Sequence, residues 1–251
     1  MKRVLLLLLL CWASSAVAQN AGIVSGSQLS AVKVKNSRSV FTVEAGADIL
    51  WMNPSDDFYK WGASVDGTGV GFHIRGLYKL RLAEELPFYA HAGLGFAYNR
   101  SGKIIENPGP EESEIFTGQY LLWYLQIPVG VEYRFELADR FALSPYLGLN
   151  FNIGLDGKYH HESKLIESGS MTNQGDIDHM FDKGTGDLRR FRPDLAFGVN
   201  AEWRRFIFGV GVQVGLNNMI QKELVELYES ENAGSPKLTY TGLTISVGYR
   251  F

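Results

Sequence analysis

The chain has 251 residues, a formal net charge of -3 at pH 7 and a mean hydropathy of -0.07. This length suits one domain or one barrel, and the mild acidity argues against a nucleic-acid partner. The single cysteine, Cys11, lies in an apolar stretch near the N-terminus, so the remaining chain offers no disulfide, thiol nucleophile or cysteine metal ligand. No later apolar run reaches about 18 residues, so no transmembrane helix is predicted.

The N-terminus has the pattern of an exported protein. Lys2 and Arg3 precede the apolar residues 4–10, and Ala16 and Ala18 give the small-x-small pattern of a cleavage site. We predict a signal peptide over residues 1–18 and a periplasmic segment over residues 19–38. Removing the two positive charges of Lys2 and Arg3 takes the formal charge from -3 to -5.

Hydrophobicity with a period of two dominates the rest of the chain and predicts β-strands, because alternate residues of a strand face opposite sides. In residues 206–216, for example, Phe206, Phe208 and Val210 alternate with glycines and Gln213. Eight segments share the pattern: residues 39–52, 69–82, 87–99, 118–135, 140–155, 191–203, 206–216 and 242–251.

The connections between these strands alternate strictly in length. Three are short, at residues 83–86, 136–139 and 204–205, and four are long, at residues 53–68, 100–117, 156–190 and 217–237. Outer-membrane barrels pair short periplasmic turns with long extracellular loops. The pattern therefore predicts an even number of strands and two periplasmic termini.

A soluble antiparallel sandwich is the alternative, and three features argue against it. The strands are longer than the usual 5 or 6 residues, aromatic residues such as Trp51 and Trp203 lie near strand ends, and the second face of each strand is small or polar. We therefore predict, for residues 39–251, an all-β fold: an eight-stranded antiparallel up-and-down transmembrane β-barrel in the outer membrane of a Gram-negative bacterium. Outer-membrane lipid would then surround the barrel.

The predicted inward faces carry charges of both signs. Eight strands enclose a lumen that side chains can just fill, and buried charges need partners. We predict a plugged barrel with an interior polar network that comprises Glu44, Asp48, His73, Arg75, Lys79, Arg81, His91, Glu132, Arg134, Asp194, Glu202 and Arg250. A narrow channel for ions or small solutes is the alternative.

Catalytic and metal chemistry find little support. His73 and His91 face inward, where Glu44, Ser144 and Asp194 are candidate partners, but no nucleophile spacing or Gly-x-Ser-x-Gly elbow occurs. We expect no enzyme, with a lipid A acyl hydrolase or transferase as the alternative. The longest loop contains carboxylates and imidazoles that are suitable cation ligands: His160, His161, Asp176, Asp178, His179 and Asp182. Their spacing matches neither the Ca²⁺ loop of an EF-hand nor the His-Glu-x-x-His zinc pattern. We interpret this loop as solvated and expect no metal or cofactor.

Residues 221–230 place Leu224, Leu227 and Tyr228 at helical spacing and predict a short helix in the last long loop, with this face packed on neighbouring loops.

The whole chain after the signal peptide resembles the PorT-like outer-membrane β-barrel proteins of Bacteroidetes-type bacteria. The resemblance rests on the signal peptide, on residues 125–135 with Pro128, and on the terminal Gly-Tyr-Arg-Phe of residues 248–251. It implies this fold and location, with Pro128 at a bulge or where no ladder donor is missed. The terminal strand, with Tyr249 and Phe251, also resembles the signal read by the barrel-assembly machinery, which implies that machinery as a transient partner.

These features together favour a non-enzymatic barrel with a plugged polar interior. It would act through its extracellular loops, in binding an unidentified protein or surface ligand or in supporting the envelope or secretion.

Overall fold

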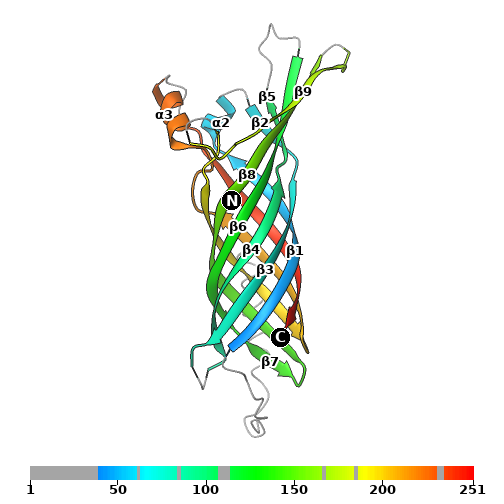
Figure 1. Cartoon of the computed structure of the whole chain (residues 1–251), viewed down its shortest axis with the longest axis vertical. Helices are drawn as coiled ribbons and strands as arrows, with labels where there is room; N and C mark the ends of the chain where they lie inside the picture. The colour runs from blue at the N-terminus through cyan, green and yellow to red at the C-terminus, as the bar shows by residue number, and fades with distance from the viewer. Residues whose placement is uncertain are drawn as a thin grey trace. The chain divides into compact units, whose positions relative to one another are not determined.

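The computed structural model describes residues 39–60, 63–83, 86–106, 114–165, 168–183, 186–230 and 235–251. The predicted signal peptide and the segment 19–38 lie outside these residues. Eight antiparallel strands form a closed ring (Figure 1): β1 (Ser39–Pro54), β3 (Gly69–Arg81), β4 (Phe88–Arg100), β6 (Glu114–Tyr133), β8 (Phe141–Leu165), β10 (Phe191–Trp203), β11 (Phe206–Gly215) and β12 (Leu238–Arg250). The predicted eight-stranded barrel is thus confirmed.

Each strand pairs with its neighbour in sequence, and β12 pairs with β1 to close the ring. In this closing pair Thr42 lies opposite Arg250 and Pro54 lies opposite Leu238. The predicted turn at Arg204 and Arg205 joins β10 to β11, with Arg204 in the left-handed region at φ 59°. Closure leaves no free edge within the ring, as a lipid environment requires.

The long connections contain structure that the period-two pattern did not predict. They hold α2 (Asp56–Lys60), β2 (Ala63–Asp66), β5 (Lys103–Glu106) and β9 (Met171–Ile177), and β8 continues ten residues past its predicted end at residue 155. These segments lie at one end of the ring, which we call the loop end; β7 (Phe135–Ala138) and Phe251 lie at the opposite, short-turn end (Figure 1).

At the loop end the strands continue as a small antiparallel sheet in the order β2-β5-β6-β8-β9. Its members mix polar and apolar residues without strict alternation, as in residues 156–165 of β8. The prediction that residues 156–190 form only a loop was wrong, because residues 156–165 are mostly polar and period two disappears there although the ladder continues.

Within the ring, burial alternates as the pattern predicted. On β1, Thr42, Glu44 and Asp48 are buried whereas Phe41 and Ile49 are exposed. The outward faces carry the exposed apolar side chains, with aromatic groups toward both ends. Contacting outward aromatics include Phe72, Tyr98 and Trp123 toward the loop end and Phe41, Phe206, Tyr249 and Phe251 at the short-turn end.

Two glycines leave space for a lumen side chain, and one proline interrupts a strand ladder. A Cβ atom at Gly211 would collide with the Tyr146 hydroxyl, and one at Gly198 would lie 2.8 Å from the same atom, so these glycines make room for that ring in the lumen. Pro128 lies where the ladder between β4 and β6 omits pairs without a change of register. The bulge of β6 lies instead between Trp123 and Tyr124.

A hydrophobic cluster lies at the loop end of the lumen and is here called the apolar cap. It combines inward residues at the strand ends with residues from the connections: Leu50, Phe58, Ala97, Ile104, Tyr120, Leu122, Tyr124, Met180, Phe181, Leu188, Met219, Ile220, Leu238 and Tyr240. Backbone hydrogen bonds hold the connections in place, from Leu188 N to Met180 O and from Arg189 N to Met219 O.

The predicted helix at residues 221–230 is confirmed as α3 (Lys222–Ser230). Leu224, from its predicted apolar face, packs against the apolar cap together with Val225. Among the described residues no helix is long and apolar enough to span a membrane.

Candidate functional site

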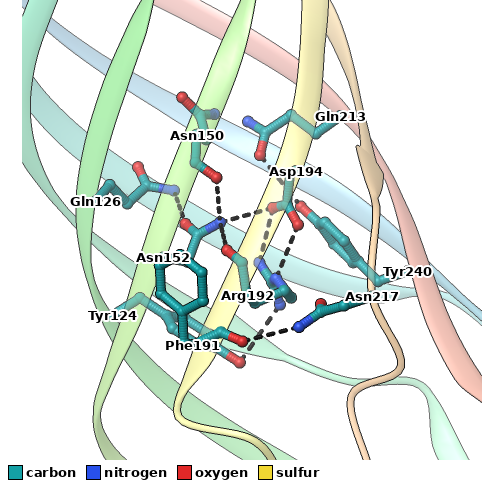
Figure 2. A network of polar contacts seen from close by, with 10 residues as sticks. All are labelled: Tyr124, Gln126, Asn150, Asn152, Phe191, Arg192, Asp194, Gln213, Asn217 and Tyr240. Atoms are coloured by element: carbon teal, nitrogen blue, oxygen red, sulfur yellow. Dashed lines mark hydrogen bonds and ion pairs between the residues drawn. The ribbon is translucent and has the colours of Figure 1, made fainter.

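The lumen next to the apolar cap is organised around one buried arginine, Arg192 (Figure 2). Its Nε and Nη2 donate to the two oxygens of Asp194 at 3.1 and 3.2 Å. Its Nη1 donates to the Tyr124 hydroxyl at 3.3 Å. The guanidinium carbon also lies 4.6 Å from the ring centre of Tyr124 and 4.2 Å from that of Tyr240. Arg192 is therefore held by a bidentate ion pair and by two aromatic faces.

Amide side chains extend this group across the lumen (Figure 2). Asn152 Nδ2 donates to Asp194 at 2.7 Å, and Gln126 Nε2 donates to Asn152 Oδ1 at 2.9 Å. Because these residues come from β6, β8 and β10, the hydrogen bonds join three neighbouring strands through the interior. They also satisfy acceptors that would otherwise be buried without partners.

Further toward the short-turn end, three pairs join inward residues of different strands. Arg75 donates to Glu44, with Nε 3.0 Å and Nη2 2.9 Å from Oε2. Lys79 Nζ lies 2.9 Å from Glu132 Oε2. In the third pair, His73 Nδ1 lies 2.9 Å from Asp48 Oδ2, and Thr244 donates to the other oxygen of Asp48 at 2.7 Å.

At the short-turn end Glu202 accepts hydrogen bonds from two arginines. Arg134 Nε and Arg250 Nη1 lie 3.1 and 3.2 Å from its Oε2. Arg134 also donates to the more exposed Glu136 at 2.7 Å. The inward carboxylates Glu44, Asp48, Glu132, Asp194 and Glu202 thus each contact a basic side chain.

Two residues of the predicted network make no ion pair with it. Arg81 lies at the end of β3, where its Nε donates to the Leu86 carbonyl at 3.2 Å, because the strand has already left the lumen. The His91 ring faces Tyr146 edge-on at 6.5 Å, and its Nδ1 is buried without a hydrogen bond. His91 therefore borders the network and contributes no ion pair to it.

Two small cavities lie between these side chains. One cavity of about 20 Å³ is lined by residues that include Arg75, His91, Glu132 and Tyr146. A second, of about 10 Å³, lies beside Lys79 and Glu202. A water needs about 10 to 15 Å³ of such space, so each cavity fits about one water. Both are far too small for a continuous aqueous path.

The sequence reasoning missed several interior groups that the structure brings together. Arg192 stands two residues before the predicted inward Asp194, and strand alternation alone assigns both to the same face. The same signal was available for the uncharged lumen residues: Gln126, Asn150, Asn152, Asn200 and Gln213. The predicted network was restricted to charged residues and histidines, so it did not include these amides.

The candidate catalytic groups are not assembled for catalysis. Glu44 and Asp194 are engaged by Arg75 and Arg192, and Asp48 is the partner of His73. Ser144 is fully buried, and its hydroxyl makes no hydrogen bond to any described residue. A serine nucleophile needs a base within hydrogen-bond reach and access for substrate.

Ion pairs join residues of the longest predicted loop. They lie on the part of β8 beyond residue 155 and on residues 171–178, together called the β8 and β9 extension. His160 Nδ1 lies 2.6 Å from Asp176, and Lys158 lies 3.1 Å from Asp178. The hydrogen bond from His160 lowers the pKa of Asp176, and Lys164 likewise lowers the pKa of Glu162. In the described part of the chain, no three His, Cys, Asp or Glu side chains form a group that could hold a metal ion.

His161 and the remaining loop residues stay apart from these pairs. The His161 ring lies against Gly175 of β9, and His179 Nδ1 lies 3.7 Å from Asp182 in a separate, exposed contact.

The two aromatic residues of the terminal motif lie on the closing seam. Tyr249 of β12 stacks edge-on against Phe206 at 5.6 Å and Phe251 at 5.1 Å. The Phe251 amide donates to the Phe41 carbonyl at 3.0 Å, and the Phe251 side chain is 70% exposed. Both rings therefore belong to the outer surface at the short-turn end.

A closed ring of eight antiparallel strands with a polar interior and an apolar outer surface defines an outer-membrane β-barrel. A family model described as an outer membrane protein β-barrel domain matches residues 19–221. The chain therefore belongs to this family of outer-membrane β-barrel proteins.

Solved structures of other barrels are similar to the chain at low identity. The attachment invasion locus protein Ail of Yersinia pestis, in complex with the heparin analogue sucrose octasulfate, is 12% identical, with 85% of this chain and 99% of Ail covered and a TM-score of 0.39. Neisserial surface protein A of Neisseria is 14% identical, with 84% and 97% covered and a TM-score of 0.35. A major outer membrane protein of Thermus thermophilus is 16% identical, with 85% and 99% covered and a TM-score of 0.39. No curated protein matches the sequence.

Proposed function

We propose that this protein is a non-enzymatic outer-membrane barrel that does not conduct and that acts through its loop end, in binding or in support of the envelope or secretion. The observation that carries the proposal is the filled interior. Ion pairs occupy the lumen from Glu202 to Asp194, and the apolar cap covers them. A barrel closed in this way offers its partners only its surface.

In this proposal the loop end faces the outside of the cell and both termini face the periplasm. The support is the difference in length between the two sets of connections, since barrels of this class place short turns in the periplasm. A cleaved signal peptide over residues 1–18 would direct export, and Tyr249 and Phe251 would present the chain to the barrel-assembly machinery. The PorT-like resemblance of residues 125–135 supports a role beside secretion or envelope components.

The loop end has more structure than solvated linkers need. The sheet β2-β5-β6-β8-β9 continues the ring, and α3 packs on the apolar cap through Leu224 and Val225. A structured surface loses little conformational entropy when it binds, which favours recognition of a partner.

Planar-bilayer recording tests the closed interior. The refolded protein should give no reproducible single-channel steps in salt solution. A control variant, Arg192→Ala with Tyr240→Ala, removes the buried guanidinium and a ring of the apolar cap that contacts it, and should raise the background conductance. Regular steps from the unchanged protein, abolished by substitution of Lys79 or Glu132, would instead establish a channel.

In-cell photocrosslinking tests the role of the loop end. A photoreactive residue at Met171 or Lys222, both exposed at the loop end, should give a discrete crosslinked product. The same residue at Leu137, exposed at the short-turn end, is the matched control. Equal products at all three positions would count against a binding role for the loops.

Mass spectrometry of lipid A tests the absence of enzyme activity. Cells with and without the gene should have the same acyl chains. An acyl chain gained or lost with the gene would establish the lipid-modifying alternative.

A further inference from the structure

A groove of about 460 Å³ opens at the loop end between the connection that precedes β10 and the start of α3. It is far larger than the two lumen cavities. Four of its lining side chains are basic, one is acidic and one is aromatic: Lys183, Arg189, Arg190, Lys222, Glu223 and Phe181. The lining therefore has a formal charge of +3, from four positive charges and one negative charge.

The basic residues of the groove differ in how they are paired. Lys183 and Arg189 have no carboxylate partner among the described residues, whereas Arg190 contacts Asp182 at 3.4 Å and Lys222 contacts Glu226 at 2.8 Å. These last two pairs are exposed, with 56% of the Arg190 side chain and 74% of the Lys222 side chain accessible. Exposed pairs of this kind contribute little energy, so an anion of higher charge can displace the carboxylates.

Arg189 is the most rigid of the four basic residues. Its Nε donates to the Ile220 carbonyl at 2.8 Å, and its backbone amide donates to the Met219 carbonyl at 2.7 Å. Met219 and Ile220 belong to the apolar cap, so the guanidinium is anchored to a packed structure. Its two terminal nitrogens make no hydrogen bond or ion pair with another described residue. A planar, oriented guanidinium favours bidentate contact with phosphate or sulfate oxygens.

We propose that this groove binds a multivalent anion that carries phosphate or sulfate groups. Arg189 makes the central contact, and Lys183, Arg190 and Lys222 surround it. The proposal deepens the proposed function, because it rests on the loop end as the binding surface and names the chemistry that this surface recognises. Such groups occur both on soluble polyanions and on the phosphorylated lipids of the outer leaflet.

Calorimetry with sodium tripolyphosphate tests the site, with the full barrel refolded in uncharged detergent micelles. The double variant Lys183→Gln and Lys222→Gln should bind at least about tenfold more weakly than the unchanged protein, because each charged hydrogen bond contributes on that order. The matched control is Lys103→Gln with Lys237→Gln, which removes the same charge from exposed positions that do not line the groove. The control should keep the original affinity.

A second arm distinguishes the two sources of the anion. The barrel is placed in phosphatidylcholine nanodiscs with or without lipopolysaccharide, and tripolyphosphate is titrated into each. Binding that persists in both discs identifies a site for soluble anions, and binding lost only with lipopolysaccharide identifies a site filled by lipid phosphate.

Two results would overturn the site: no binding of tripolyphosphate in micelles, or equal weakening by the groove variant and its control. Either result leaves the closed lumen intact. Conversely, channel steps in the bilayer recording would remove the proposed function and leave this groove unaffected.

Discussion

The lumen and the apolar cap fill the same barrel by opposite chemistry. In the lumen, inward side chains from most strands of the ring form ion pairs and hydrogen bonds, such as Arg192 with Asp194. In the cap, side chains from connections far apart in sequence meet as a hydrophobic cluster, with Leu188 only 1% exposed. Paired charges stabilise the lumen, whereas the removal of apolar side chains from water stabilises the cap. The difference predicts distinct energetic signatures for the two regions.

The largest effect is expected from an unpaired charge in the lumen. Arg192→Ala leaves the fully buried carboxylate of Asp194 without its cation, and the free energy of unfolding should fall by about 3 to 5 kcal/mol. Urea titration of the barrel in phosphatidylcholine vesicles measures this change. The double variant Arg192→Met with Asp194→Leu removes both charges and should regain most of the loss. A single-variant cost below about 1 kcal/mol would mean that the lumen is hydrated enough to solvate Asp194.

The next effect concerns the cap and should stay within it. Leu188→Ala removes buried apolar volume and should destabilise the cap by about 2 to 4 kcal/mol. Hydrogen exchange should then speed up at the amides of Leu188 and Met180, which donate to the carbonyls of Met180 and Gly157, and remain slow along β11. Leu137→Ala, at a 60% exposed position, is the control and should change neither. Equal acceleration in β11 would show that cap and ring unfold together.

A smaller effect is expected for a lumen hydrogen bond whose donor is uncharged. Thr244→Val keeps the shape but removes the donor to Asp48, and the free energy of unfolding should fall by about 1 to 2 kcal/mol. The same urea titration measures it. Thr241→Val, three residues earlier at an exposed hydrogen bond with Asn53, should cost less than about 0.5 kcal/mol. A similar loss of unfolding free energy at both threonines would show that buried and exposed hydrogen bonds contribute equally to stability.

The smallest effect belongs to the β8 and β9 extension, outside both regions. His160 lowers the pKa of Asp176 through its hydrogen bond, so His160→Gln should return that pKa toward 3.8. The contribution of a depressed carboxyl pKa to stability is present above the unfolded value and is lost as the pH falls through the folded value. Carbon NMR titration of the carboxyl groups measures the shift. Glu162 is the internal control, because its lowered pKa depends mainly on Lys164 and should change little.

Period two was sufficient to predict the ring, since one face of every strand meets lipid and the other meets the lumen. The same rule also predicts which residues point inward, and it would have identified Arg192 from Asp194. It could not predict which inward residues pair, because strand register decides whether Lys79 meets Glu132. Nor could it predict the cap, because Phe58, Leu188 and Ile220 lie in connections with no regular period and meet only after the loops fold.

The groove at the loop end was also beyond the sequence. Lys183, Arg189, Arg190 and Lys222 do not form one basic run, and they become neighbours only when the connection before β10 packs beside α3. The hydrogen bond from Arg189 to the Ile220 carbonyl links the two segments, and it depends on the packed cap.

The seam between β1 and β12 has a consequence for how the chain folds. β1 begins at Ser39 and β12 ends at Arg250, so the closing pair joins distant parts of the chain. Until this pair forms, β1 has one row of backbone groups without a partner, and such an edge can pair with other chains. Contacts between the two ends of a chain also form slowly. We therefore expect closure of the ring to be a late step of folding, in which this edge stays exposed until β1 and β12 meet.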